Sequence, residues 1–307
     1  MQPYGLSPGD CADESVRKIL RRLLGALRSN VDGVVEDTDV EFLHDLRVAN
    51  RRTRTALSQT RGVLSLSVMD TFPPEFKWLG DVTGPCRDLD VFLLGMDGYR
   101  HQSKIDDGAL GPLKNSIREK RRLQHRLVRA ALLSERFQNL IKNWSRFLES
   151  GSEGETEPPL ASASTIDVAS PRIFKAYRRI SKRDTGFDIE PSTELLHQLR
   201  IDGKKLRYLL EFFSDLYPRT TALRFIGELK QLQDILGGFN DTVVQLALIN
   251  EFSDQGTASA ETLAATNRLT VAIEEHQHGL RAEFSKRFEL FASDESRKLY
   301  RKTFNVN

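Results

Sequence analysis

The chain has 307 residues, of which 39% are hydrophobic and 29% are charged, and its net charge is only +2. The length suggests two domains, and the hydrophobic fraction is sufficient for a core in each of them. No apolar run approaches the roughly 20 residues that span a bilayer, and residues 1–15 lack the apolar segment of a signal peptide. Cys11 and Cys86 provide neither a disulfide framework nor metal-ligand spacing. We therefore expect a cytoplasmic protein with no membrane partner.

Nearly every long segment of the first half has the periodicity of an amphipathic helix, and alternating strand patterns are scarce. Asp39 is a candidate N-cap, and Pro73-Pro74 suits the first turn of a helix. Gly84-Pro85 should break a helix. We expect helices at residues 12–29, 40–67, 74–83, 86–98, 109–134 and 136–149.

The second half begins after a polar segment, residues 150–165, that is rich in Gly, Pro and Ser. Ser192 is a candidate helix start, and Gly237-Gly238 is a candidate break. Helices are expected at residues 170–184, 192–216, 219–236, 239–254, 259–291 and 294–303. The prediction is an all-α protein with helical bundles at 1–149 and 168–307, joined by a linker at 150–167.

An internal repeat supports this division. The block His44-Asp-Leu-Arg47-Val-Ala-Asn-Arg51-Arg52-Thr-Arg54 returns 153 residues later as His197-Gln-Leu-Arg200-Ile-Asp-Gly-Lys204-Lys205-Leu-Arg207. The same offset relates Arg87-Asp88 to Asn240-Asp241, and it relates Lys77 to Lys230. Several blocks with one offset indicate a tandem duplication. Asp88 and Asp241 would each follow a helix break and either cap a helix or orient an arginine.

Cations recur at helical spacing in both copies of the block. Residues three, four and seven apart share a helix face, so each copy forms a cationic stripe beside an apolar row. The stripes consist of His44, Arg47, Arg51 and Arg54 in the first copy and His197, Arg200, Lys204 and Arg207 in the second. A solvated charged face normally interleaves acids, because like charges four residues apart repel. Neither stripe does so, which favours an anion site over a solvated surface.

The residue types indicate which anion is bound. The planar guanidinium group donates two hydrogen bonds to one phosphate, and lysine adds a mobile charge. A row of both suits a long anion with repeated charges. Further cations could contribute to such a site, and His125 could donate to the same anion. These additional candidates are Arg22, Lys77, Arg87, Arg118, Arg122, His125, Arg179 and Lys230.

The two histidine–arginine blocks, together with the Gly-x-x-Arg/Asn-Asp blocks at 84–88 and 237–241, resemble the CHAD family (conserved histidine α-helical domain). The resemblance extends over about residues 12–303. It implies two four-helix bundles related by a pseudo-two-fold axis across a basic central cavity. It also implies binding of inorganic polyphosphate, including at polyphosphate granules, with the two stripes lining the channel. Neither a cofactor nor a metal is implied.

Two other functions remain open from the sequence. A metal-dependent phosphohydrolase would need carboxylates near its metal, whereas the stripes present cations, and no catalytic constellation is found. A nucleic-acid-binding protein for single strands would interleave aromatic residues with its cations, and the stripes hold only Tyr208. We therefore predict non-catalytic binding of polyphosphate or another linear polyanion, with nucleic acid disfavoured as a partner.

Overall fold

A computed structural model describes residues 3–150, 157–183 and 191–304. The described residues form eleven α-helices and one 3₁₀ helix and contain no strand, which confirms the all-α prediction. Among them, no helix combines the length and apolar character required to cross a membrane.

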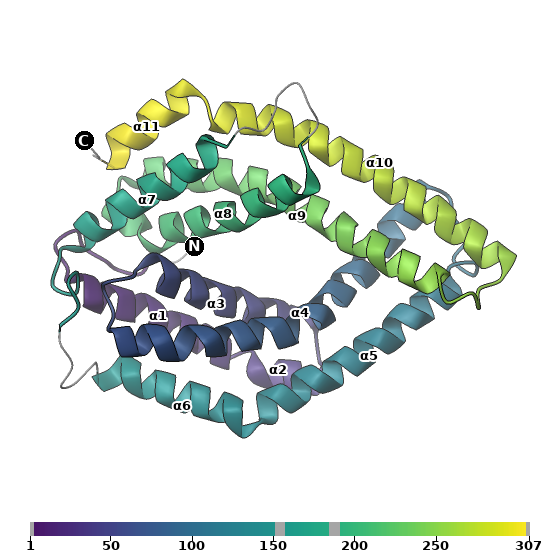
Figure 1. Cartoon of the computed structure of the whole chain (residues 1–307), viewed down its shortest axis with the longest axis horizontal. Coiled ribbons are helices and arrows are strands. Elements are labelled where there is room, and N and C mark those ends of the chain that lie inside the picture. Colours follow the sequence, from purple (N-terminus) through teal and green to yellow (C-terminus); the bar gives the residue numbers. More distant parts are fainter. Residues whose placement is uncertain (1–2, 151–156, 184–190, 305–307) are drawn as a thin grey trace.

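The first half contributes six helices (Figure 1). They are α1 (Ala12–Arg28), α2 (Val31–Glu36), α3 (Val40–Gln59), α4 (Leu66–Gln102), α5 (Gly111–Leu133) and α6 (Glu135–Ser150). The short α2 was not predicted, because six residues are too few to establish a periodicity. It ends at Asp37, whose φ of 55° is left-handed.

The second half contributes the remaining helices. They are α7 (Thr165–Ser181), α8 (Thr193–Phe212), the 3₁₀ helix η1 (Ser214–Leu216), α9 (Arg219–Ser253), α10 (Ala260–Phe291) and α11 (Asp294–Phe304). Two predicted caps are confirmed. The side chain of Asp39 accepts a hydrogen bond from the Glu41 amide at the start of α3, and that of Ser192 accepts one from the Leu195 amide in α8.

The predicted helix breaks are wrong. Gly84-Pro85 lies inside the 37-residue α4, and Gly237-Gly238 lies inside the 35-residue α9. An interior glycine costs only about 1 kcal/mol, and packing of a long helix can outweigh this. A Cβ atom at Gly238 would lie 3.2 Å from Leu280 of α10, so this glycine permits close packing between the two helices.

Several predicted helix ends also need correction. The helix expected at 40–67 ends at Gln59, because a turn with Gly62 at φ 84° follows it. Pro73-Pro74 lies within α4, which begins at Leu66. The helix expected at 192–216 ends at Phe212, where η1 takes over. The helix expected at 170–184 begins at Thr165, with Ser164 as its N-cap.

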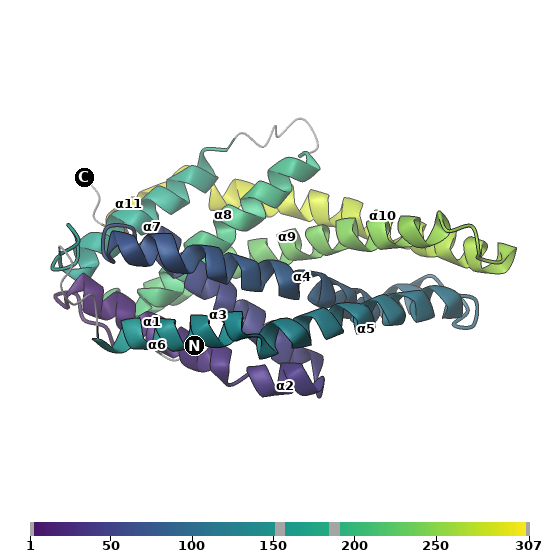
Figure 2. The same cartoon turned by 60° about the horizontal axis from the view of Figure 1, so that its bottom comes forward.

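Two apolar cores hold the helices together, and each contains residues of both halves. The larger core includes Leu46 of α3 and Leu209 of α8, two helices that contact each other. The smaller core includes Phe92 of α4 and Leu269 of α10. It lies where the hairpins α4–α5 and α9–α10 converge, away from the other helices (Figures 1 and 2).

The transition between the cores falls on a repeated sequence block. Along α4, the larger core ends at Cys86 and the smaller begins at Leu89, with Arg87 and Asp88 between them. Along α9, Phe239 belongs to the larger core, and the next residue assigned to the smaller one is Ile249. The charged positions of this block therefore lie between two apolar layers.

Candidate functional site

The two cationic stripes meet where α3 contacts α8. The Nε atom of Arg51 on α3 donates a hydrogen bond to the Tyr208 hydroxyl on α8, at 2.8 Å. Electrostatic interactions also connect Arg51 with Arg200 and Lys204 across this contact. The stripes thus lie together at the contact between the halves and not on opposite flanks.

A pocket of about 840 Å³ opens beside this contact. Helices α3, α4 and α8 and the turn after α3 supply its walls. Its cationic lining residues are Arg51, Arg54, Arg61, Lys77, Arg200, Lys204 and Lys205. Among the described residues that line the pocket, Asp70 is the one acid. The pocket therefore has a strong excess of positive charge.

Several of these cations lack an acidic partner. Within the described part of the chain, no ion pair involves Arg51, Arg54 or Lys204. Arg200 lies 3.8 Å from a carboxylate oxygen of Asp241, and its Nε atom is buried with no hydrogen-bond partner among the described residues. Buried donors are rarely left unsatisfied in native proteins. An anion in the pocket would supply the missing acceptors.

The packed cations perturb one another. Burial, together with the charges of Arg51 and Arg200, lowers the pKa of Lys204 to about 6. Burial is also the main cause that lowers the pKa values of Arg47 and Arg200, and neighbouring guanidinium groups add to it. Gathering these like charges is unfavourable. A bound anion would relieve this repulsion and favour the charged form of Lys204.

Two buried carboxylates face the cations. Burial raises the pKa values of Asp88 and Asp241, and each is held down in part by an arginine, Arg47 and Arg200 respectively. The expectation that these residues cap helices is wrong, because both lie inside long helices. Their electrostatic attraction to Arg47 and Arg200 agrees with the alternative expectation, that they orient arginines.

Glycines of α4 make room for the α3 arginines, and sequence reasoning missed them. A Cβ atom at Gly80 would lie 2.9 Å from an Nη atom of Arg54, and one at Gly84 would lie 3.5 Å from an Nη atom of Arg47. Arg47 also donates hydrogen bonds to the Gly80 carbonyl and the Thr83 hydroxyl, both at 2.9 Å. The four-residue spacing of the glycines was the available signal, because small residues at that spacing share a helix face.

The histidines that open the stripes do not line this pocket. His44 is half-buried, and burial lowers its pKa, with Arg87 adding to the effect. His197 is exposed, and its Nδ1 atom lies 3.1 Å from Oδ1 of Asn240. It lines a separate pocket of about 420 Å³ between α8 and α9.

The last cation of the second stripe is neutralised. Arg207 pairs with Glu211 at 2.7 Å and donates to Gln233 at 3.2 Å. The expectation that neither stripe is compensated is therefore wrong for Arg207. Its repeat partner Arg54 is exposed and lines the pocket. Lys230 is exposed on α9, away from the pocket lining.

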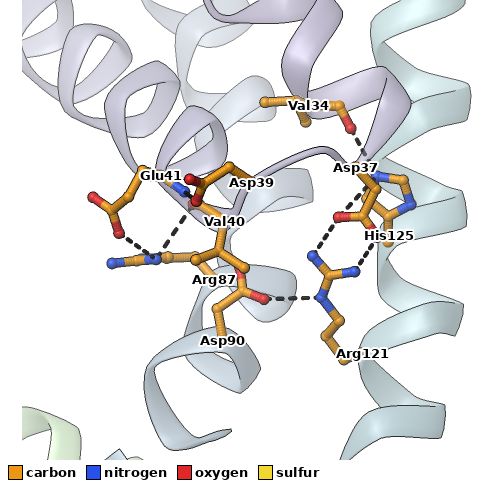
Figure 3. A network of polar contacts seen from close by, with 9 residues as sticks. All are labelled: Val34, Asp37, Asp39, Val40, Glu41, Arg87, Asp90, Arg121 and His125. Carbon is orange, nitrogen blue, oxygen red and sulfur yellow. Dashed lines mark hydrogen bonds and ion pairs between the residues drawn. The ribbon is translucent and has the colours of Figure 1, made fainter. Parts of the chain in front are cut away.

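Arg87 and the α5 candidates lie elsewhere, mostly in contacts that connect helices (Figure 3). His125 donates to the Val34 carbonyl of α2 at 2.7 Å. Arg87 lies 3.6 Å from a carboxylate oxygen of Glu41. Arg118 and Arg122 are exposed, and Arg122 pairs with Glu119 at 3.3 Å.

Arg121, which was not a candidate, is the centre of the network in Figure 3. It binds Asp37 and Asp90. The short helix α2 is thereby connected to both α4 and α5. Hydrogen bonds from Arg121 lower the pKa of Asp37. This part of the basic α5 segment therefore has a structural role.

The remaining candidates are also outside the pocket lining. Arg22 donates to the Pro3 carbonyl at 2.9 Å and lies over the ring of Tyr4. Arg179 pairs with Asp202 at 3.1 Å. In contrast, Arg61 lines the pocket but lies beyond the end of α3, where helical spacing could not identify it.

No group of three or more His, Cys, Asp or Glu side chains within the described residues could hold a metal ion. The pocket therefore presents cationic groups and hydroxyls, which suit an anionic ligand. Most of its cations come from the two stripes, with Arg61 and Lys77 added from their surroundings.

Curated relatives resemble most of this chain. It is 28% identical over 243 residues to the uncharacterized protein Rv2226 of Mycobacterium tuberculosis strain H37Rv, which is 75% of this chain and 44% of that protein. It is 27% identical over the same length to the uncharacterized protein MT2285 of strain CDC 1551. The chain therefore spans less than half the length of these relatives.

Solved structures share the fold. The crystal structure of the CHAD domain from the plant Ricinus communis has a TM-score of 0.70 and 24% identity, over 100% of this chain and 96% of that one. PptA from Streptomyces chartreusis has a TM-score of 0.69 and 16% identity, over 91% of this chain and 100% of that one. The CHAD family model matches residues 18–250. Since this match covers more than half of the sequence, the chain belongs to the CHAD-domain family.

Proposed function

We propose that this protein binds inorganic polyphosphate in the pocket between α3, α4 and α8, without catalysing a reaction on it. The observation that carries the proposal is the convergence of two cationic stripes on one pocket where carboxylates do not match them. Seven cationic side chains line the pocket, and among the described residues that line it Asp70 is the single acid.

The chemistry of the lining favours phosphate groups in a row. Guanidinium groups bind phosphate oxygens in pairs of hydrogen bonds, and Arg51, Arg54 and Arg200 provide such groups on two facing helices. A linear polyphosphate offers one charge after another, so it can contact several cations at once. Release of its counterions would contribute much of the affinity, as it does for other phosphate polymers.

Aromatic residues distinguish this ligand from a single-stranded nucleic acid. Single-strand binders stack bases on exposed rings, and no described residue that lines the pocket is aromatic. Tyr208, the aromatic residue of the second stripe, is buried and accepts a hydrogen bond from Arg51. A ligand without bases is therefore the better match. Through such binding, the protein would collect at polyphosphate granules in the cytoplasm.

Retention on immobilised polyphosphate tests the proposal. The parent should be retained, and increasing salt should elute it. A variant with Arg51, Arg54, Arg200 and Lys204 replaced by alanine should lose retention while keeping its helical circular dichroism. A matched control replaces Arg118, Arg122, Arg126 and Arg129 of α5, which are exposed and outside the pocket.

The control removes the same number of positive charges and should still be retained. Equal loss in both variants would mean that general basicity, and not this pocket, binds polyphosphate. Competition with RNA and DNA at matched charge tests the nucleic-acid alternative. Phosphate release and elemental analysis of the purified protein test the alternative of a metal-dependent phosphohydrolase.

A further inference from the structure

Equivalent positions of the two stripes have different surroundings. Arg54 and Arg207 are separated by the repeat offset of 153 residues. Arg54 is exposed, lines the 840 Å³ pocket and has no ion-pair partner within the described chain. Arg207 is outside the pocket lining and is paired with Glu211. One sequence pattern has therefore produced an available cation and a neutralised one.

Two substitutions between the repeats account for the difference. Thr55 and Ser58 line the pocket beside Arg54, and the positions 153 residues later are Tyr208 and Glu211. The side chain of Glu211 is 5% exposed and pairs with both Arg207, at 2.7 Å, and Arg52, at 2.9 Å. A buried carboxylate between two guanidinium groups cancels most of their attraction for an anion.

The N-terminal segment covers the same side. The Tyr4 ring packs edge-on against Phe212, with ring centroids 6.1 Å apart, and its hydroxyl accepts from Arg52 at 3.4 Å. The backbone amide of Gly5 donates to a carboxylate oxygen of Asp215, beyond the end of α8, at 2.7 Å. The small pocket that remains beside Arg52, of about 260 Å³, includes the acidic residue Asp45.

We infer that the polyphosphate site is one-sided: the ligand lies along α3 and α4 against Arg51, Arg54 and Lys204, and the Arg52–Glu211–Arg207 network closes the α8 side to phosphate. The inference rests on the proposed function and adds which repeat binds. It also defines the ligand as a short oligophosphate segment, because a closed side prevents a long chain from gaining contacts beyond the pocket.

The test uses positions equivalent in the repeat. Arg54→Gln and Arg207→Gln each remove one charge, and calorimetric titration with linear polyphosphates of increasing defined length measures affinity and its salt dependence. Arg54→Gln should weaken binding about tenfold, since hydrogen bonds to charged groups are strong, and should reduce the salt slope by about one. Arg207→Gln should leave both unchanged. Equal weakening by the two variants would overturn the inference.

A second pair of variants avoids the buried network, in case Arg207→Gln fails to fold. Lys77 lines the pocket, whereas its repeat partner Lys230 does not, and both side chains are exposed. Lys77→Ala should weaken binding and Lys230→Ala should not, and an equal effect would overturn the inference.

Chain length gives an independent readout. For the parent, affinity per chain end should reach a plateau once the oligophosphate fills the pocket, and a continued rise with length at one protein per chain would contradict one-sided binding. Absence of any binding to the parent would instead refute the proposed function.

Discussion

The stripe on α3 and the stripe on α8 share a sequence pattern, yet their charges are in different states. On α3, Arg51 and Arg54 face the pocket, and no described carboxylate pairs with them. On α8, Lys205 lies 3.5 Å from the buried Asp202, and Arg207 is held by Glu211. The spacing of cations thus identifies a charged face, but acids from the surrounding helix positions decide whether that face can bind an anion.

The comparison can be broken most strongly at Glu211. Glu211→Ala would leave Arg52 and Arg207 without their shared partner. Removing one member of a buried ion network costs about 3 kcal/mol, which urea denaturation can measure. The repeat-equivalent change Ser58→Ala should alter the free energy of unfolding by less than about 0.5 kcal/mol, since surface changes usually have small effects. Similar values for both would show that the two sides are energetically alike.

The reverse experiment places an acid in the α3 stripe. Ser58→Glu adds a carboxylate four residues after Arg54, which is the spacing between Arg207 and Glu211. It should weaken polyphosphate binding about 30-fold, because it neutralises one arginine and repels the ligand, together about 2 kcal/mol. Gln59→Glu is the control, since it introduces the same charge on a residue outside the pocket lining. Equal weakening would mean that net charge decides.

The pH dependence of binding sharpens the role of Lys204. Its pKa is lowered to about 6 in the free protein, and a bound polyanion should raise it. Binding above pH 6 therefore takes up a proton, so affinity should fall as pH rises from about 6 to 8, by at most about tenfold per pH unit. Titrations in buffers of different ionisation enthalpy measure this uptake. Lys204→Met should bind more weakly and lose the dependence, and an unchanged slope would exclude Lys204 as its source.

The smallest effect concerns the link between the stripes. Tyr208→Phe removes the hydroxyl that accepts from Arg51. The loss of one hydrogen bond should reduce the free energy of unfolding by about 1 kcal/mol, as measured by urea denaturation. Polyphosphate affinity should change less than it does in Arg51→Ala, because the guanidinium group remains. A larger loss of affinity in Tyr208→Phe would make the hydroxyl, and not Arg51, the more important group.

The sequence was most informative where the pattern was long and periodic. The all-α class, most helices and the caps at Asp39 and Ser192 follow from local propensity and spacing, which act within a few residues. The predicted breaks at Gly84-Pro85 and Gly237-Gly238 failed because packing between distant helices outweighed a local cost. Tertiary contacts decide such cases, and a single sequence does not show them.

The candidate site was predictable to a similar extent. Helical spacing brought Arg51, Arg54 and Arg200 into one set, and the structure places them around one pocket. It also placed Arg207 in that set, because the effect of Glu211 depends on burial that spacing does not reveal. Arg61 was missed for the opposite reason, since it reaches the pocket from a turn. The position of an acid or a turn in space was the missing information.

The position of the charged layer between two shared cores has a further consequence. Folding itself forces the cations together before any ligand arrives, so the empty protein stores electrostatic strain. A polyanion that binds only the folded form would stabilise it in proportion to the logarithm of its concentration. The resistance of the protein to heat and proteolysis would then report how much polyphosphate surrounds it.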